Sequence, residues 1–252
     1  MPIQVSELDP KDRQKSLVQA HVAKQKNFMV TRGRCDYCAL LLSHCMCAKL
    51  EALALPEESL DFSVAVIMNT REKYRSSNTA KVIEKVLHGL LLVDGIDQDE
   101  RLLEKLLARN ANKVFVLFPS ESSVEYSHMD ASQFSEIPLI LVPDGTWRQA
   151  RRLNQKIPAN IPRVRVAPQT LSRFLCRRQT LPDRVCTVEA LALLMADMGK
   201  DRESKQLELG LATVVESFNL QCFGSTHRPN HMLKQLPQGK DLPPRHPDSL
   251  IS

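Results

Sequence analysis

Apolar runs alternate with helical patterns along the middle of the chain. Three short runs, rich in β-branched residues, are typical of strands that are buried on both faces of a sheet: 62–69, 112–119 and 137–143. Apolar residues at helical spacing predict five helices, over 80–95, 97–110, 146–156, 187–198 and 203–222. Strands that alternate with helices predict an α/β domain with a largely parallel sheet. Ligands bind outside the carboxyl ends of such strands, so we expect the active site in the loops that follow them.

The two ends of the chain differ from this middle part. Residues 11–30 predict a polar amphipathic helix with Leu17, Val18, His21 and Val22 on one stripe. The tail from Gly224 holds five prolines among many polar residues, which predicts an extended or disordered segment. We therefore expect four parts: an N-terminal helical extension (1–30), a cysteine-rich module with its linker (31–60), the α/β domain (61–223) and the tail (224–252).

Composition narrows the class of protein. A length of 252 residues with 43% hydrophobic residues suits one domain with a real core. No apolar run approaches the roughly 20 residues that a membrane span needs. The charged N-terminus lacks the apolar region of a secretory signal. We therefore expect a soluble cytosolic protein that has no membrane partner.

The positive charge is concentrated in one part of the chain. Residues 144–195 hold ten Arg and Lys against three acids, although the whole chain carries only +5. Guanidinium groups match the geometry of phosphate oxygens, so this segment suggests a phosphate-rich partner. A solvated basic helix face is the alternative.

A cluster of cysteines lies between the first helix and the first strand. Cys35, Cys38, Cys45 and Cys47 offer four soft ligands at short spacing, which favours tetrahedral zinc, and His44 is an alternative to one of them. Four protein ligands leave no open coordination position, so the predicted metal is structural rather than catalytic.

The other three cysteines are scattered. Cys186 precedes a predicted helix, whose N-terminus can lower the pKa of a thiol. We therefore weigh a nucleophilic role for Cys186 against a packed thiol.

The segment "PDGTW" joins a predicted strand to a predicted helix. Asp144 can present its carboxylate at the strand end, Gly145 allows a close backbone approach, and Thr146 can cap the helix. Trp147, the single tryptophan, offers an aromatic face to a flat ring or packs in the core, and its spacing does not decide between the two.

Several segments together resemble a known family. "DGTW" matches the Asp-x-Thr-Trp signature of the DTW-domain family, and the chain is similar to its tRNA-uridine aminocarboxypropyltransferases. Other segments also resemble that family, in the same order: "CDYC…CMC", "SSNTAKV", "LFPSESS" and "RQTLPDRVCTVEAL". The resemblance covers roughly residues 30–200. Cys186 stands where the family tends to have serine, which makes an essential nucleophile there a poor interpretation.

This resemblance implies a fold and a reaction. The family is similar to the knotted SPOUT class, whose S-adenosylmethionine is held by three loops near the knot. The implied reaction moves the 3-amino-3-carboxypropyl group of S-adenosylmethionine to N3 of a tRNA uridine, expected at position 47 in the variable loop. The chain lacks a G-x-G-x-x-G turn, so loops take over cofactor binding. The expected cofactor-binding residues are Pro119, Ser120, Glu121, Pro143, Asp144, Gly145, Thr187, Val188 and Glu189.

The resemblance also suggests residue roles. Asp144, Thr146 and Trp147 are the expected catalytic residues, with Asp144 accepting or orienting the N3 proton, or positioning the cofactor. Glu189 either binds the amino group of the methionine moiety or interacts with its own helix N-terminus. The expected RNA-binding residues are Arg148, Arg151, Arg152, Arg173, Arg177, Arg178 and Asn78.

Two of these assignments keep an alternative. One of the last three arginines can instead hold the methionine carboxylate. Asn78 and Thr79 can simply cap the helix that begins near Ala80.

Three other functions remain open at this point. A SPOUT-type RNA methyltransferase uses the same cofactor, and a related family transfers the same group to ribosomal RNA. A zinc-containing RNA-binding protein without catalysis is the third. The resemblance suggests a chain that can work as a monomer.

Overall fold

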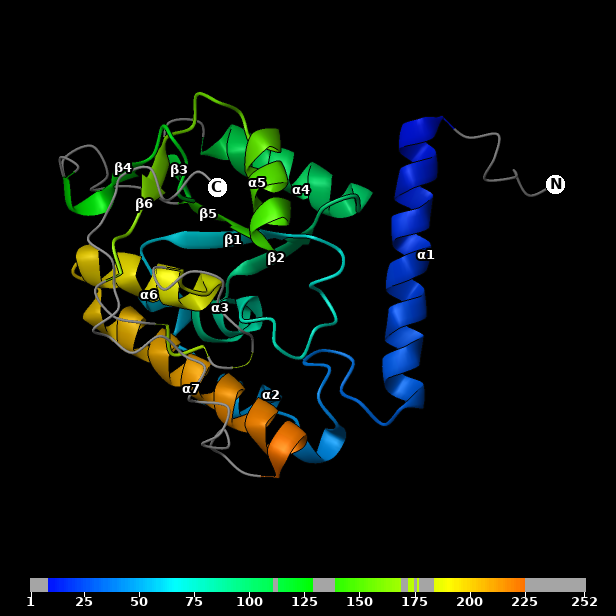
Figure 1. Cartoon of the computed structure of the whole chain (residues 1–252). Helices are drawn as coiled ribbons and strands as arrows, with labels where there is room; N and C mark the ends of the chain where they lie inside the picture. The colour runs from blue at the N-terminus through cyan, green and yellow to red at the C-terminus, as the bar shows by residue number, and fades with distance from the viewer. Residues whose placement is uncertain are drawn as a thin grey trace.

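A parallel sheet with helices on both faces forms the centre of the molecule. The computed structural model describes residues 9–110, 113–128, 139–168, 172–174, 176 and 184–224. Six strands, all paired in parallel, follow the order β2-β1-β5-β3-β6-β4 (Figure 1). The predicted α/β class and the parallel sheet are therefore confirmed, and the knot remains a prediction.

The central strands consist of the apolar runs that the sequence marks. The strands are β1 (Ser63–Met68), β2 (Leu90–Val93), β3 (Val114–Leu117), β4 (Val124–Glu125), β5 (Leu139–Asp144) and β6 (Arg163–Arg165). Every residue of β3 and β5 is buried, as is every residue of β1 after Ser63. Apolar and β-branched side chains fit a strand that is covered on both faces, which explains why these three runs are recognisable in the sequence.

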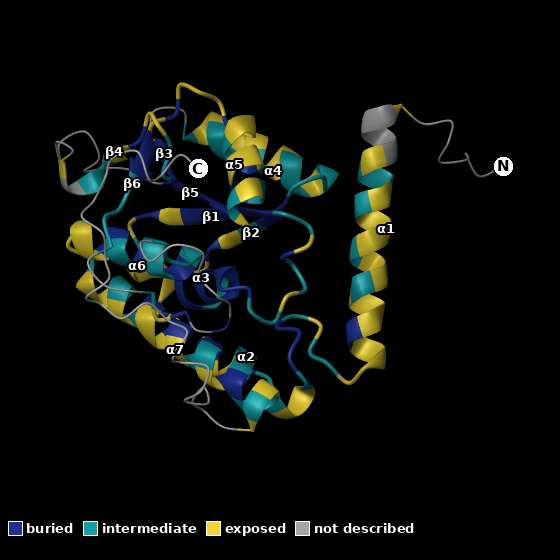
Figure 2. Cartoon of the chain, in the orientation of Figure 1, coloured by how far each residue is buried: buried dark blue, intermediate teal, exposed yellow. Residues whose placement is uncertain are grey.

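Two hydrophobic cores lie on opposite faces of the sheet. The larger one is covered by α2 (Cys47–Glu51), α3 (Ala80–Leu87), α6 (Thr187–Asp197) and α7 (Asp201–Phe223). The smaller one is covered by α4 (Asp97–Arg109) and α5 (Trp147–Lys156). Figure 2 shows the buried positions concentrated on the strands and on the helix sides that face them. Three short 3-10 turns, at Leu42–His44, Glu57–Ser59 and Tyr126–His128, lie in the connections.

One predicted helix is wrong in its second half. The sequence predicts a helix over 80–95, whereas α3 ends at Leu87 and residues 90–93 form β2. His88 ends the helix in the left-handed conformation, with φ of 53°. Gly89 follows, where an added Cβ would lie 2.7 Å from the Cγ2 of Ile83. The sharp reversal needs this glycine, and the apolar residues after it belong to a strand rather than to another helical turn.

Two short strands escape the sequence analysis. Both β4 and β6 span no more than three residues, and β6 consists of Arg163, Val164 and Arg165. A run that short and that charged carries no recognisable strand pattern.

The N-terminal helix α1 (Pro10–Thr31) lies to one side of the α/β body (Figure 1). The predicted helix is confirmed, but its apolar stripe is only partly covered, because Leu17 is 57% exposed. Lys15 forms ion pairs with Asp97 and Glu100 at the start of α4, at 2.5 and 3.3 Å. No helix in the described part of the chain is long and apolar enough to cross a membrane.

The C-terminal helix also matches its prediction. α7 extends one or two residues beyond the predicted 203–222 at each end, and Gly224 ends it with φ of 66°. The predicted extended tail beyond Gly224 lies outside the described residues.

Candidate functional site

Asp144 is the last residue of β5, and its carboxylate is held from two directions. The hydroxyl of Thr187, in the first turn of α6, donates a hydrogen bond of 2.5 Å to Oδ1. The side-chain amide of Asn78 donates to Oδ2 at 3.2 Å. Asp144 itself is only 7% exposed. The carboxylate is therefore fixed at the carboxyl end of the sheet by residues from two other segments.

Asn78 is in turn fixed by its neighbours. Its Oδ1 accepts a hydrogen bond of 2.7 Å from the backbone N–H of Ala80, at the start of α3. Its Nδ2 also donates to the carbonyl of Glu72 at 3.0 Å. The oxygen of the amide must face a donor, so the amide nitrogen is turned towards Asp144. Asn78 thus satisfies a helix-start N–H and orients Asp144, and its expected contact with RNA remains a prediction.

The turn after Asp144 needs its glycine and its threonine. Gly145 has φ of 152°, and a Cβ on it would lie 2.9 Å from the Cβ of Gln149. Thr146 caps α5 as predicted: its Oγ1 accepts from the N–H of Gln149, whose side chain accepts from the N–H of Thr146 at 2.8 Å. This capping box fixes the direction in which α5 leaves the strand end.

Trp147 packs against the core, one of the two interpretations that the sequence leaves open, and its stacking on a flat ligand ring stays a prediction. Its ring is half-buried and packs against the smaller core, with its centroid 6.2 Å from that of Phe118 and a tilt of 47°. The guanidinium of Arg184 lies 4.6 Å from the ring centroid, a cation–π arrangement. Trp147 therefore joins the loop after β3, the turn after β5 and the segment before α6.

The expected cofactor loops come together only in part. Thr187 reaches Asp144 directly, and Trp147 meets Phe118, the residue before Pro119. Within the loop after β3, the N–H of Ser120 and its carbonyl both bond Oγ of Ser123. The other expected residues differ in exposure: Glu121 is exposed, Pro143 is buried within β5, and Val188 is fully buried in the larger core.

Glu189 binds protein donors in this structure. Its carboxylate accepts hydrogen bonds from the N–H of Cys186 at 2.8 Å, from the hydroxyl of Ser172 at 2.6 Å and from the N–H of Arg173 at 2.5 Å. The contact with Cys186 supports the interpretation that Glu189 interacts with the N-terminus of its own helix, α6. The other two contacts tie residues 172–173 to that helix, and the expected contact with a cofactor amino group stays a prediction.

Cys186 has the surroundings of a packed thiol. Burial raises the pKa of the Cys186 thiol well above its ordinary value, and the nearby charge of Glu189 raises it further. A protonated thiol is a poor nucleophile, so the structure favours the packed interpretation.

The predicted RNA-binding arginines lie in different places. Arg148, Arg151 and Arg152 are all exposed on α5. Arg173 is 75% exposed in its side chain and lies 4.0 Å from Glu208. Arg177 and Arg178 lie outside the described residues.

Part of the basic segment has a structural task. The guanidinium of Arg163 donates to the carbonyls of Asn154 at 3.1 Å, Ile157 at 2.8 Å and Pro158 at 2.7 Å, and it is 8% exposed. It therefore satisfies carbonyls at the end of α5 and in the turn after it. The charge count of residues 144–195 overstates the positive surface by at least this residue.

The four predicted metal ligands come together. The sulfur atoms of Cys35, Cys38, Cys45 and Cys47 all lie within 4.8 Å of one another. The pairs Cys35–Cys47 and Cys38–Cys45 are each separated by 3.7 Å. A tetrahedral site with Zn–S bonds of about 2.3 Å has sulfur–sulfur edges of about 3.8 Å, so the arrangement fits zinc. His44 is not part of this group, and its Nδ1 instead lies 2.9 Å from the hydroxyl of Ser43.

The cysteine loop, residues 35–47, packs on the same core as the sheet. Cys38, Leu40, Met46 and Leu50 are fully buried in the larger hydrophobic core. Tyr37, between two ligands, donates a hydrogen bond to Glu84 of α3. A metal bound here would therefore stabilise one side of the α/β body as well as its own loop.

Sequence analysis misses several residues around the site. Arg184 and Phe118 contact Trp147, and although both lie in segments that resemble the family, nothing in the sequence marks them as neighbours of Trp147. The sequence predicts an RNA contact or a helix cap for Asn78 and a cofactor contact for Thr187, but it does not predict their hydrogen bonds to Asp144. Those contacts bridge 66 and 43 positions of the chain, so no local signal reveals them.

Comparison with known proteins identifies the family of the chain. No solved structure matches the chain. The sequence model of the DTW domain matches residues 32–219, which include the cysteine loop, Asp144 with its turn, and most of α7. The match covers well over half of the chain, and the protein therefore belongs to the DTW-domain family.

Proposed function

We propose that this protein transfers the 3-amino-3-carboxypropyl group of S-adenosylmethionine to N3 of a tRNA uridine, with 5′-methylthioadenosine as the second product. The expected target is uridine 47 in the variable loop. One observation carries the proposal: the carboxylate of the DTW signature, Asp144, is buried at the end of β5 and oriented by Thr187 and Asn78. Membership of the DTW-domain family supports a role in tRNA modification.

The reaction is an alkyl transfer in which one bond forms, one bond breaks and one proton leaves. A bond forms between uracil N3 and the γ-carbon of the methionine moiety, while the bond from that carbon to sulfur breaks. The N3 proton leaves, and the sulfonium becomes a neutral thioether. A sulfonium can lose any of its three substituents, so the protein must align the γ-carbon rather than the methyl group with N3.

Asp144 is the residue that we assign to the N3–H group. An ionised carboxylate only accepts hydrogen bonds, and the two donors on it fix the direction of its oxygens. Held in this way, Asp144 accepts the proton as the bond forms or orients N3–H for its departure. The guanidinium of Arg184 lies over the ring of Trp147, and a uracil or adenine ring can stack on the outer face of this guanidinium or replace it on the tryptophan.

The remaining parts of the proposal concern binding and fold. Exposed Arg148, Arg151 and Arg152 on α5 suit the phosphates of tRNA. The cysteine site suits structural zinc, which would fix the loop and take no part in transfer. We further propose that the sheet is knotted as in the SPOUT class and that the chain acts as a monomer.

The test uses two samples of S-adenosylmethionine, one labelled on the methyl group and one on the methionine carboxyl carbon. Each is incubated with unmodified tRNA and, in a separate reaction, with ribosomal RNA. Carboxyl label in tRNA without methyl label is the expected result, and full activity of Asp144→Asn would exclude the role given to Asp144. Methyl label in tRNA would identify a methyltransferase instead. Carboxyl label that enters ribosomal RNA but not tRNA would show that ribosomal RNA is the substrate. Binding of tRNA without transfer of either label would indicate an RNA-binding protein without catalysis.

A further inference from the structure

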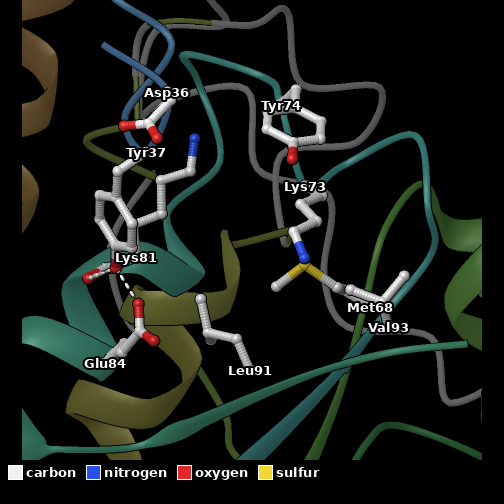
Figure 3. A pocket seen from close by; sticks show the side chains of 9 residues that line it. All are labelled: Asp36, Tyr37, Met68, Lys73, Tyr74, Lys81, Glu84, Leu91 and Val93. Carbon is white, nitrogen blue, oxygen red and sulfur yellow. Dashed lines mark hydrogen bonds between the residues drawn. The ribbon is translucent and has the colours of Figure 1, made fainter. Parts of the chain in front are cut away.

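A cavity of about 220 Å³ lies between the cysteine loop and the carboxyl ends of β1 and β2. Its apolar floor is formed by Met68, Leu91 and Val93 from the two strands. Figure 3 shows Tyr37 and Lys81 on one side of the space, with Lys73 and Tyr74 on the other. Pockets that enclose a whole small molecule measure roughly 300–1,000 Å³, so this one suits a single group of a larger ligand.

The cavity contains a deeply buried ammonium group. Lys81 is 2% exposed, and its Nζ donates a hydrogen bond of 2.8 Å to the carbonyl of Arg75. A buried ammonium has three hydrogens to place and a large cost of lost hydration, which an anion offsets better than a neutral carbonyl does.

Each of the two acids that line the cavity already has a partner. Asp36 pairs with Lys26 of α1 at 3.7 Å, and Glu84 accepts the hydroxyl of Tyr37. Among the described residues, neither Lys73 nor Lys81 forms an ion pair with a carboxylate. Asp36 and Glu84 balance the two lysines in charge, so the cavity offers an anion two ammonium donors rather than a net positive charge.

The walls of the cavity are held in place before any ligand arrives. The loop of residues 69–79 makes three successive backbone turns, closed by the N–H groups of Glu72, Arg75 and Asn78. Lys81 of α3 binds the carbonyl of Arg75 and so fastens this loop to the helix, and Asn78 binds the carbonyl of Glu72 within the loop. A site that is already ordered loses little conformational entropy when it binds.

The same loop connects the cavity with the candidate reaction site. Asn78, at the end of this loop, donates to Asp144. Met68 of the floor is the register partner of Asp144 on the neighbouring strand. Partners in a parallel pair point their side chains to the same face of the sheet, so the cavity opens on the face that carries the Asp144 carboxylate.

We propose that this cavity is a phosphate subsite for one nucleotide of the tRNA strand, with Lys73 and Lys81 facing the phosphate and Tyr74 beside the sugar or base. The proposal rests on tRNA being the substrate. The shared chemistry is an anion, which could also be the carboxylate of the cofactor, and the test separates these two sources.

The test measures binding of uridine 5′-monophosphate to the full-length, zinc-loaded protein by isothermal titration calorimetry. Lys73→Met and Lys81→Met remove each ammonium and keep an unbranched side chain of similar length. Lys105→Met, at an exposed lysine of α4 on the opposite face of the sheet, is the matched control. We expect each cavity variant to weaken binding at least tenfold, the control to bind as the wild type does, and uridine without phosphate to bind at least tenfold more weakly.

Three results would overturn the proposal. One is unchanged binding of the monophosphate by Lys73→Met, which lies on a loop and should fold even if Lys81→Met does not. The second is equal binding of uridine and its monophosphate. The third is competition by L-methionine for the same two lysines, which would assign the cavity to the cofactor carboxylate.

These measurements contain no S-adenosylmethionine and follow no transfer. Lysine-dependent binding together with a failed transfer assay would leave the subsite and remove the proposed reaction. Transfer without lysine-dependent binding would support the proposed reaction and exclude the subsite.

Discussion

The hydroxyl of Thr187 donates a hydrogen bond to the carboxylate of Asp144 and so joins the first turn of α6 to the end of β5. Asn78 completes the arrangement from the start of α3. Three segments that are far apart in the chain thus determine where one carboxylate points. The orientation of Asp144 is a property of the whole larger core, because that core positions both helices.

Removal of the Thr187 hydroxyl should slow transfer more than it lowers stability. A hydrogen bond to a charged group contributes about 1.5–3 kcal/mol, so we expect Thr187→Val to lower kcat roughly ten- to hundredfold. Thr187→Ser keeps the donor and should retain most of the activity. Single-turnover transfer and thermal melting of both variants check this. Equal rates for the two variants would show that the hydroxyl does not orient the carboxylate.

Each chain should bind one zinc ion that is needed for the fold around it. Chelation is expected to expose Leu40, Met46 and Leu50, which are now fully buried, and to make the N-terminal side sensitive to protease. Cys38→Ser should lower the zinc content well below one ion per chain, whereas Cys222→Ser, at an exposed position, should leave it unchanged. Elemental analysis and limited proteolysis test this, and an unchanged digestion pattern after chelation would contradict it.

The arginines on α5 should determine the salt dependence of tRNA binding. Each lost phosphate contact lowers the slope of log K against log salt by about one. The triple variant Arg148→Ala, Arg151→Ala and Arg152→Ala should therefore bind tRNA more weakly and with a flatter slope. A matched control changes the exposed Arg202 and Lys205 of α7, on the other face of the sheet. The same slope in both variants would place the tRNA elsewhere.

Cys186 should react slowly with alkylating reagents. Because burial raises the pKa of its thiol well above the ordinary value, little thiolate is present at pH 8. Iodoacetamide should modify the exposed Cys222 first and leave Cys186 unmodified in the zinc-loaded protein. Mass spectrometry of the peptides measures both. Cys186→Ser should keep its activity, and rapid loss of activity on labelling of Cys186 would reopen the nucleophilic role.

Local chemistry explains which features could be predicted. The strand that ends at Asp144, the glycine at 145 and the cap at Thr146 lie within eight residues, and each follows from its own neighbours. The four cysteines lie within thirteen residues, so their meeting needs little more than a tight loop. Features of this kind can be predicted because residues close to them in the sequence determine them.

The features that escaped prediction depend on distant contacts. Residues 90–93 form a strand because they pair with β1, although their apolar side chains continue the helical spacing of α3. By sequence, Arg163 belongs to the basic segment, but its guanidinium is buried because it donates hydrogen bonds to carbonyls at and after the end of α5. The cation over Trp147 comes from Arg184, which is 37 positions later in the chain by residue number. Tertiary packing decides each of these cases.

The order of strands also has a consequence for how the protein folds during synthesis. β1 pairs with β2, which follows it within about thirty residues of chain, but its other edge pairs with β5, which ends at Asp144. That edge of β1 is open while the ribosome makes the intervening segment, with apolar side chains on both faces of the strand. Non-local parallel pairing forms slowly, so the nascent chain should depend most on chaperones in this interval.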